Sequence, residues 1–395
     1  MNYEVHRVSD EEMYFFDLRG YLVIPNVLSK AEIAKCSAAL DAKMGGARKF
    51  KAGRLSRGAK ALAGKSSRVE LTGMLGWEPR YREPFRKLLV HPVVVSRLNE
   101  FSGKGFRLDH GPMMIQSKKG AEGHRFHGGG EPFSQATWYH QQNGKIYCRG
   151  ITVAWQLEDC NPGDGGFAIV PGSHKLAEPT PQEVRNYDDD MGLVEQVSMK
   201  AGDVLFFAET ATHGTLPWKA NHDRRSILYK YASRAAARAV GKHFTPEERY
   251  GDWVNELTPE QQAVLYGPGV HHGGRLPILD SDGKKVWIEG VASASAKKAK
   301  KTKKAKKAKK VAKKAKKTAK KVKKATKKAA KKPAKKAAKK AAKKTVKKAR
   351  KAAPKKAKKA VKKARKAAPK KAKKAVKKAA KKSVKKAKKA KKARR

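Results

Sequence analysis

Cysteine, long apolar runs and a leader-like N-terminus are scarce or absent in this sequence. The three cysteines, Cys36, Cys148 and Cys160, are odd in number and widely spaced, which argues against a disulfide framework and a cysteine-rich metal motif. No run of about 18 apolar residues occurs, so we expect no membrane span. The first residues lack a basic stretch followed by an apolar one, which argues against a secretory signal. We therefore expect an intracellular, cytoplasmic protein with reduced thiols.

Acidic and aromatic residues are absent from the C-terminal part of the chain. Residues 291–395 contain 56 Lys or Arg and no Asp, Glu, Phe, Trp or Tyr. Residues 1–290 hold the other 39 basic residues against 34 acidic ones, an ordinary balance for a globular domain. A segment with charge of one sign and no aromatics cannot bury enough apolar surface to fold alone. The sequence therefore predicts a globular domain over 1–290 and a disordered or transiently helical lysine-rich tail over 291–395.

Short apolar runs separated by Gly, Asn, Asp and Pro dominate the middle of the globular part. This spacing favours a sandwich or double-sheet barrel over alternating strands and helices. Capping boxes at Ser29, Thr245 and Thr258 predict the starts of flanking helices. Residues 41–70 are rich in Gly and Lys and are expected to form an exposed loop. We expect helices near 84–89 and 93–101, and strands at 20–25, 106–116, 146–157, 167–170, 194–199, 204–207 and 226–232.

A turn, a buried strand and a histidine follow one another closely in the sequence. Gly202 and Asp203 form the turn, 204–207 is the strand, and a short connection then delivers His213. Arg224 follows eleven positions later, which is enough for the chain to turn and place both side chains in one pocket. An imidazole beside a guanidinium suits a metal site that also holds a carboxylate-bearing co-substrate. A hydrogen-bonded loop histidine and a surface arginine are the plain alternative.

The order of several motifs resembles the phytanoyl-CoA dioxygenase family. These motifs cover roughly residues 10–235 and are the strand 20–25, the strand 152–157, the Gly-Gly turn and Pro-Gly-Ser-His-Lys of 164–175, the His213-Gly214 pair and Arg224. The resemblance implies a mainly β protein with a double-stranded β-helix (jelly-roll, cupin-like) core and flanking helices. It also implies a dioxygenase that uses Fe(II) and 2-oxoglutarate, with hydroxylation of a small molecule as the expected reaction.

The same resemblance implies roles for individual residues. His213 is then the distal iron ligand, and Arg224 binds the far carboxylate of 2-oxoglutarate. Arg225 is the fallback anchor, because neighbouring side chains of a regular strand point to opposite faces.

The family's His-x-Asp pattern is missing from the expected stretch, which reads GHRFHGGGE over residues 123–131. We favour His127 as the proximal ligand, because it ends an expected strand and precedes conformationally permissive glycines. Gly129 then stands where the carboxylate would be. Glu131 can complete the ligand set, water or a halide can take the position as in the iron halogenases that this pattern resembles, or the site binds iron poorly.

Other histidines have their own interpretations. His124 and His140 are rival ligands, or loop residues beside a substrate cleft. His174, inside Pro-Gly-Ser-His-Lys, is expected to order its loop. The pair His271 and His272 is expected to lie in a Gly-rich turn.

The lysine-rich tail predicts binding to a polyanion. It repeats VKKARKAAPKKAKKA at 346–360 and 361–375. The composition resembles linker-histone C-terminal tails and implies DNA binding, or RNA binding, through phosphates without sequence specificity. The protein would then be associated with the nucleoid or chromatin. Contact residues expected within the repeats are Lys347, Lys348, Arg350, Lys362, Lys363 and Arg365.

Two other functions follow from the same residues. The chain can be a DNA-packing, histone-like protein with an inactive oxygenase domain, as the missing His-x-Asp suggests. It can also be a halogenase-like variant, in which a halide replaces the carboxylate.

Overall fold

The computed structural model describes residues 7–128, 137–236, 245–268 and 277–289 of the chain. Glu131, His271, His272 and the lysine-rich tail, for which the sequence makes predictions, lie outside these residues. The helices within the described ranges are all too short or too polar to cross a bilayer.

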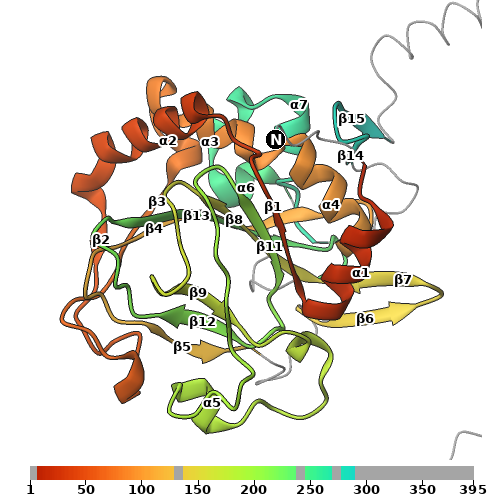
Figure 1. The fold of residues 1–395 in the computed structure, drawn as a ribbon. Coiled ribbons are helices and arrows are strands. Elements are labelled where there is room, and N and C mark those ends of the chain that lie inside the picture. Colours follow the sequence, from red (N-terminus) through yellow and green to blue (C-terminus); the bar gives the residue numbers. More distant parts are fainter. Residues whose placement is uncertain (1–6, 129–136, 237–244, 269–276, 290–395) are drawn as a thin grey trace, which may run out of the picture. The chain divides into compact units, whose positions relative to one another are not determined.

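The strands of the described residues form two main antiparallel sheets (Figure 1). The larger sheet has the order β1-β11-β8-β13-β4-β3-β2, and the smaller one β10-β9-β12-β5. Strands of the larger sheet are β1 (Tyr21–Ile24), β2 (Arg48–Lys49), β3 (Val69–Thr72), β4 (Arg107–Ser117), β8 (Gly150–Gln156), β11 (Val204–Ala208) and β13 (Arg224–Ala232). Strands of the smaller sheet are β5 (His124–His127), β9 (Gly166–Ile169), β10 (Glu195–Gln196) and β12 (His213–Leu216).

Successive core strands pass back and forth between the two sheets. After β4 the chain forms β5 in the smaller sheet, returns as β8, forms β9 and β10, returns as β11, and adds β12 and β13 to opposite sheets. A cluster of buried side chains from both sheets, including Phe167, Ile169, Leu205 and Phe207, fills part of the space between them. The fold is mainly antiparallel β with flanking helices, and its strand order is consistent with the expected double-stranded β-helix.

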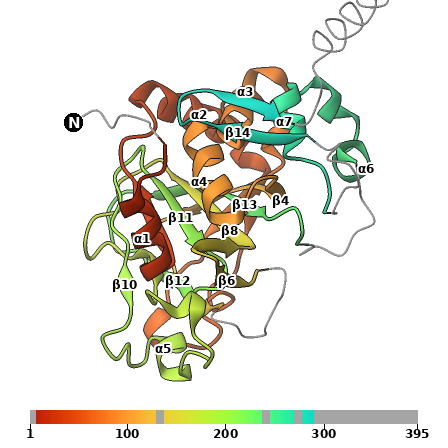
Figure 2. The same ribbon diagram turned by 90° about the vertical axis from the view of Figure 1, so that its right-hand side faces the viewer.

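Most helices cover the face of the larger sheet that points away from the smaller sheet, whereas α5 packs against β5 of the smaller sheet (Figures 1 and 2). They bury Leu40, Phe85 and Leu98 in the main hydrophobic core. The helices of the described residues are α1 (Asp10–Arg19), α2 (Lys30–Lys43), α3 (Pro79–Leu89), α4 (Pro92–Ser102), α5 (Gln182–Asn186), α6 (Pro246–Tyr250) and α7 (Pro259–Ala263). Two further hairpins pair β6 (Tyr139–Gln142) with β7 (Lys145–Cys148), and β14 (Ile278–Ser281) with β15 (Val286–Glu289). Short 3-10 turns lie at Met44–Gly46, Lys60–Leu62, Met74–Gly76, Ser173–Lys175 and Asp252–Glu256.

Most expected elements are present, and two expected strands differ. The capping boxes that begin at Ser29, Thr245 and Thr258 are confirmed. The expected strand 146–157 is interrupted, because β7 pairs in a hairpin with β6 whereas β8 joins the larger sheet. The expected strand 194–199 is reduced to β10, since the backbone of Met199 bridges to Cys160 instead.

Candidate metal and co-substrate site

His127 and His213 lie opposite each other on neighbouring strands of the smaller sheet. The antiparallel register of β5 and β12 pairs the Cα atoms of these two residues. Directly opposite side chains of an antiparallel pair share one face of the sheet. The ring centroids are 4.4 Å apart, so two residues distant in sequence converge on one point.

Each of these two imidazoles is oriented by a backbone carbonyl two residues earlier. Nδ1–H of His127 donates to the carbonyl oxygen of Arg125 at 3.1 Å, and Nδ1–H of His213 donates to that of Ala211 at 2.7 Å. A carbonyl oxygen only accepts, so Nδ1 carries the proton and Nε2 keeps its lone pair in both rings. Burial lowers the pKa of His127 to about 2, so its ring is neutral at physiological pH.

The two rival histidines lie in different places. His124, at the start of β5, lines the same cavity with its ring centroid 4.5 Å from that of His127, and burial lowers its pKa to about 3. His140 lies on β6, stacked on Tyr147 at 4.8 Å, and does not line this cavity. The cavity thus gathers three imidazoles, although among the described residues no three His, Cys, Asp or Glu side chains form a complete metal site.

Arg224 reaches the same cavity from the first position of β13. Its side chain is 5% exposed, its Nε is buried without a hydrogen-bond partner, and no carboxylate of the described residues pairs with it. Burial lowers the pKa of this guanidinium to about 10, which leaves it charged at neutral pH. Gly166 permits the close approach, because a Cβ there would lie 3.1 Å from the Arg224 Nε.

Arg225 lies on the other face of the larger sheet, as side-chain alternation predicts. It forms an ion pair with Asp41 at 2.9 Å and donates a hydrogen bond to Gln116 at 3.1 Å. It is therefore already paired and does not line the cavity that holds Arg224.

One cavity of about 110 Å³ contains all these groups except Arg225 and His140. Apolar side chains, among them Phe167 and Phe207, form much of its wall. Arg68 adds a second guanidinium, which Glu70 holds at 2.6 Å. A small, largely apolar space with a few placed polar groups is typical of a site for small molecules.

An ion pair between a buried carboxylate and a partly buried lysine at this cavity is not predicted from the sequence. Glu209, just after β11, accepts a hydrogen bond from the Thr152 hydroxyl and pairs with Lys230 at 3.1 Å. Lys230 lines the cavity, and the Glu209 charge acts on His127. Alternation along β13, counted from Arg224, is a signal that identifies Lys230. Glu209 has no comparable signal, because it stands alone between an apolar strand and the histidine.

His174 lies outside the cavity and joins two segments of the chain. Its Nε2 lies 3.1 Å from the carbonyl oxygen of Asp17, and its ring packs edge-on against Tyr139. Burial lowers its pKa to about 4. These contacts agree with the expected loop-ordering role.

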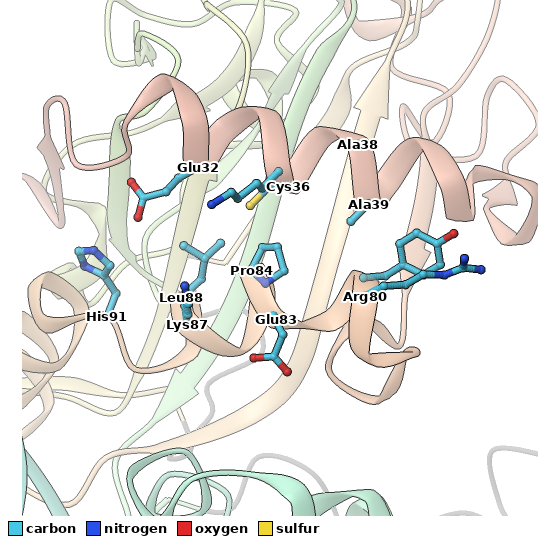
Figure 3. Close-up of a pocket in the computed structure, with 12 residues that line it drawn as sticks. Glu32, Cys36, Ala38, Ala39, Arg80, Glu83, Pro84, Lys87, Leu88 and His91 are labelled. Atoms are coloured by element: carbon cyan, nitrogen blue, oxygen red, sulfur yellow. The ribbon is translucent and has the colours of Figure 1, made fainter.

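A larger groove, of about 550 Å³, lies between α2 and α3 (Figure 3). Cys36 and Ala39 of one helix line it together with Pro84 and Leu88 of the other. Burial raises the pKa of the Cys36 thiol to about 12, so this sulfur is not a nucleophile. The groove has one histidine, His91, and lacks the paired imidazoles of the smaller cavity.

The chain is similar to proteins of solved structure and matches one family model. HygX from Streptomyces hygroscopicus with nickel and 2-oxoglutarate bound is similar at 22% identity and a TM-score of 0.47, over 57% of this chain and 87% of that chain. SnoK, a non-heme α-ketoglutarate-dependent carbocyclase from nogalamycin biosynthesis, is similar at 18% identity and a TM-score of 0.44, over 67% and 94%. No curated protein matches the chain. The phytanoyl-CoA dioxygenase (PhyH) model matches residues 16–226, more than half of the chain, which confirms the resemblance seen in the sequence. The chain therefore belongs to the PhyH family of Fe(II)- and 2-oxoglutarate-dependent dioxygenases.

Proposed function

We propose that the chain hydroxylates a small molecule with Fe(II) held by the Nε2 atoms of His127 and His213. The observation that carries this proposal is the matched pair of Nδ1–H bonds to backbone carbonyls. Such bonds fix the tautomer and orientation of metal-binding imidazoles and raise their basicity. The neutral ring of His127 binds a cation without first losing a proton.

Arg224 is the residue that we propose for the far carboxylate of 2-oxoglutarate. A buried guanidinium with an unpartnered Nε gains most from a carboxylate, which accepts two parallel hydrogen bonds from the fork. Arg225 is already neutralised by Asp41 and is the weaker candidate.

For the third protein ligand we propose Glu131, two residues after the glycine that replaces the family's carboxylate. A carboxylate suits the remaining facial position. Glu131→Gln is expected to lower the iron affinity measured by equilibrium dialysis. Unchanged iron affinity, together with 2-oxoglutarate consumption that depends on chloride, would instead support the halogenase-like arrangement.

When bound, Fe(II) and 2-oxoglutarate supply the oxidising chemistry, in which O₂ converts 2-oxoglutarate to succinate and carbon dioxide while the substrate is hydroxylated. The protein orients the co-substrate through Arg224 and excludes water with Phe167 and Phe207. Lys230, which forms an ion pair with Glu209, lines the cavity and presents a polar group to which a substrate hydroxyl can bind.

Oxygen-dependent formation of succinate by the full chain with Fe(II) tests this proposal. His213→Ala is expected to abolish both succinate formation and iron binding. His140→Ala is the matched control, because this histidine lies on the β6–β7 hairpin outside the cavity. Absence of turnover in the wild type, with DNA binding retained, would favour a packing protein with an inactive oxygenase domain.

We further propose that the tail, residues 291–395, binds DNA, or RNA, through its phosphates. The 56 basic residues without any acidic one support this proposal, because neutralising phosphates releases condensed counterions. Lys347, Lys348, Arg350, Lys362, Lys363 and Arg365 of the repeats are proposed contacts. Lysine-to-glutamine changes in both repeats should weaken binding equally for DNA of any sequence, as measured by fluorescence anisotropy.

A further inference from the structure

The positive charge of the globular part is concentrated in one short segment. Residues 42–69, called the basic segment here, hold nine Lys or Arg and no Asp or Glu. The rest of residues 1–290 holds 30 basic and 34 acidic residues, so its own balance is negative. Such an asymmetry is the electrostatic footprint of a surface that meets an anion.

Seven of the nine cations are exposed and have no acidic partner among the residues that the structure describes. The two that are less exposed are also the two that form ion pairs, Lys43 with Glu78 and Arg68 with Glu70. No carboxylate of the described residues pairs with the other seven, which lie close in sequence and repel one another. These exposed residues are Arg48, Lys49, Lys51, Arg54, Arg57, Lys60 and Lys65.

The backbone of the basic segment is fixed rather than merely exposed. The carboxylate of Glu122, which is 3% exposed, accepts hydrogen bonds from the amides of Gly53 at 2.8 Å and Ser56 at 3.1 Å. Buried Leu55 and Leu62 anchor the segment, and their carbonyls accept bonds from residues in and just before β5. The cations therefore stand on a preorganised loop, which lowers the entropy cost of binding.

The segment adjoins the cavity that holds the two paired histidines. It runs from β2 past the edge of the smaller sheet at β5 (Figure 1). At its end Arg68 lines the cavity wall. The amide of Lys65 donates to the carbonyl of Gly120, which brings the exposed Lys118 and Lys119 beside the same surface.

Nucleic acid is the partner that fits this surface best. Seven exposed cations without acidic partners among the described residues, all within one short segment, match repeated phosphates rather than a single anion. The guanidiniums of Arg48 and Arg54 each lie over the Phe50 ring, 4.7 Å and 5.3 Å from its centroid, and planar guanidiniums offer stacking surfaces to unpaired bases. No large apolar side chain of the segment is exposed for insertion into a membrane.

We propose that residues 48–65, with Lys118 and Lys119, form an ordered surface that binds single-stranded nucleic acid beside the oxygenase cavity. This surface is separate from the tail and does not depend on the proposed role of the tail or on iron chemistry. It places a bound strand next to the site where oxidation is proposed.

Lysine acetylation of the full chain, read by mass spectrometry with and without a single-stranded DNA oligonucleotide, tests the proposal residue by residue. We expect a several-fold fall in the labelling of Lys49, Lys51, Lys60 and Lys65. Exposed lysines of α2 and α3, namely Lys30, Lys35 and Lys87, are internal controls and should be labelled as before. Tail lysines report tail binding in the same spectra, so failure of either surface is seen separately.

Charge-matched variants complete the test. The variant Arg48→Gln, Arg54→Gln, Arg57→Gln and Lys60→Gln should lose protection at Lys49, Lys51 and Lys65. A control variant removes the same charge from α2 and α3 and should keep the protection of these three lysines. It carries Lys30→Gln, Lys35→Gln, Arg80→Gln and Lys87→Gln. Equal labelling with and without DNA, equal protection of the control lysines, or protection by phosphatidylserine vesicles alone would overturn the proposal.

Discussion

Arg224 is the residue whose surroundings indicate a bound ligand most directly. Its guanidinium is buried, charged and unpaired at Nε. Arg224→Lys keeps the charge but loses the planar fork that matches a carboxylate. We expect the dissociation constant of 2-oxoglutarate to rise about 10- to 100-fold, the equivalent of about 1.5–3 kcal/mol for charged hydrogen bonds. Calorimetric titration of the Fe(II)-loaded protein under anaerobic conditions measures it.

Arg225→Lys is the matched control for this measurement, since Arg225 is the next residue but points to the opposite face and pairs with Asp41. Its 2-oxoglutarate affinity should match that of the wild type. Equal weakening in both variants would mean that the loss came from disturbance of β13 rather than from the proposed carboxylate contact.

The Glu209–Lys230 pair is a second residue-scale prediction. Glu209 is 6% exposed, and its loss leaves the partly buried Lys230 without a counter-charge. Glu209→Gln is therefore expected to lower the free energy of unfolding by about 1–3 kcal/mol. Urea unfolding measures this change. Adding Lys230→Met should restore part of the loss, and strictly additive effects of the two changes would contradict a direct coupling.

Among the elements, the turn before β9 shows why its glycines are needed. Gly163 and Gly165 both have positive φ, 85° and 91°. A Cβ at Gly165 would lie 2.0 Å from the carbonyl oxygen of Pro217, whereas a Cβ at Gly163 meets nothing within 4 Å. Gly165→Ala should therefore destabilise the fold by clearly more than the ~1–2 kcal/mol expected for the left-handed backbone alone.

Gly163→Ala isolates that backbone cost and should show it without the clash. The two midpoints of thermal unfolding are compared directly. Similar midpoints for the two variants would show that the loop moves away from Pro217 at little cost, contrary to the expected rigidity of this connection.

Local signals decided which elements were predictable. The helices at Ser29, Thr245 and Thr258 carry their own capping boxes and were identified correctly. The sequence does not predict α1, although Ser9 and Glu12 form a capping box. Its apolar residues do not share one face, since Phe16 is buried whereas Tyr14 and Leu18 are exposed, and this weakens the apolar periodicity.

The residues of the candidate site also differ in whether a local sequence signal predicts them. His213 and Arg224 follow a recognisable turn and strand, and so they were found together. The register that pairs His127 with His213 is a long-range property of β5 and β12, which no short window of sequence contains. The Glu209–Lys230 contact joins two elements in the same way, and it carried no motif to reveal it.

For the whole molecule, two histidines remote from the site, the partly buried His91 and the buried His174, predict acid sensitivity. Burial lowers the pKa of His91 and of His174 to about 4 in the folded chain, against about 6.5 when unfolded. Between these values the unfolded chain binds protons that the folded chain does not. Stability is therefore complete above about pH 6.5 and falls as pH decreases toward 4, by up to about 1.4 kcal/mol per pH unit for each histidine.

Urea unfolding at pH 7 and pH 5 checks this dependence. His91 accepts a hydrogen bond from the amide of Val93 at the start of α4, so His91→Gln retains an acceptor while removing one titration. This variant should show a smaller pH dependence than the wild type. A wild-type midpoint that is unchanged between the two pH values would contradict the proposed proton uptake.

Two activities on one chain should respond differently to salt. A protein that neutralises several phosphates loses DNA affinity in proportion to the counterions released, about 10³–10⁵-fold between 50 and 200 mM salt for 6–10 contacts. The proposed site for 2-oxoglutarate is a buried cavity, where salt screens charge interactions only weakly. The rate of succinate formation should therefore change little over the same range of salt concentration. His213→Ala should keep the full salt dependence of DNA binding while losing turnover. Parallel loss of both activities with salt would instead mean that the polycation and the oxygenase domain act as one unit.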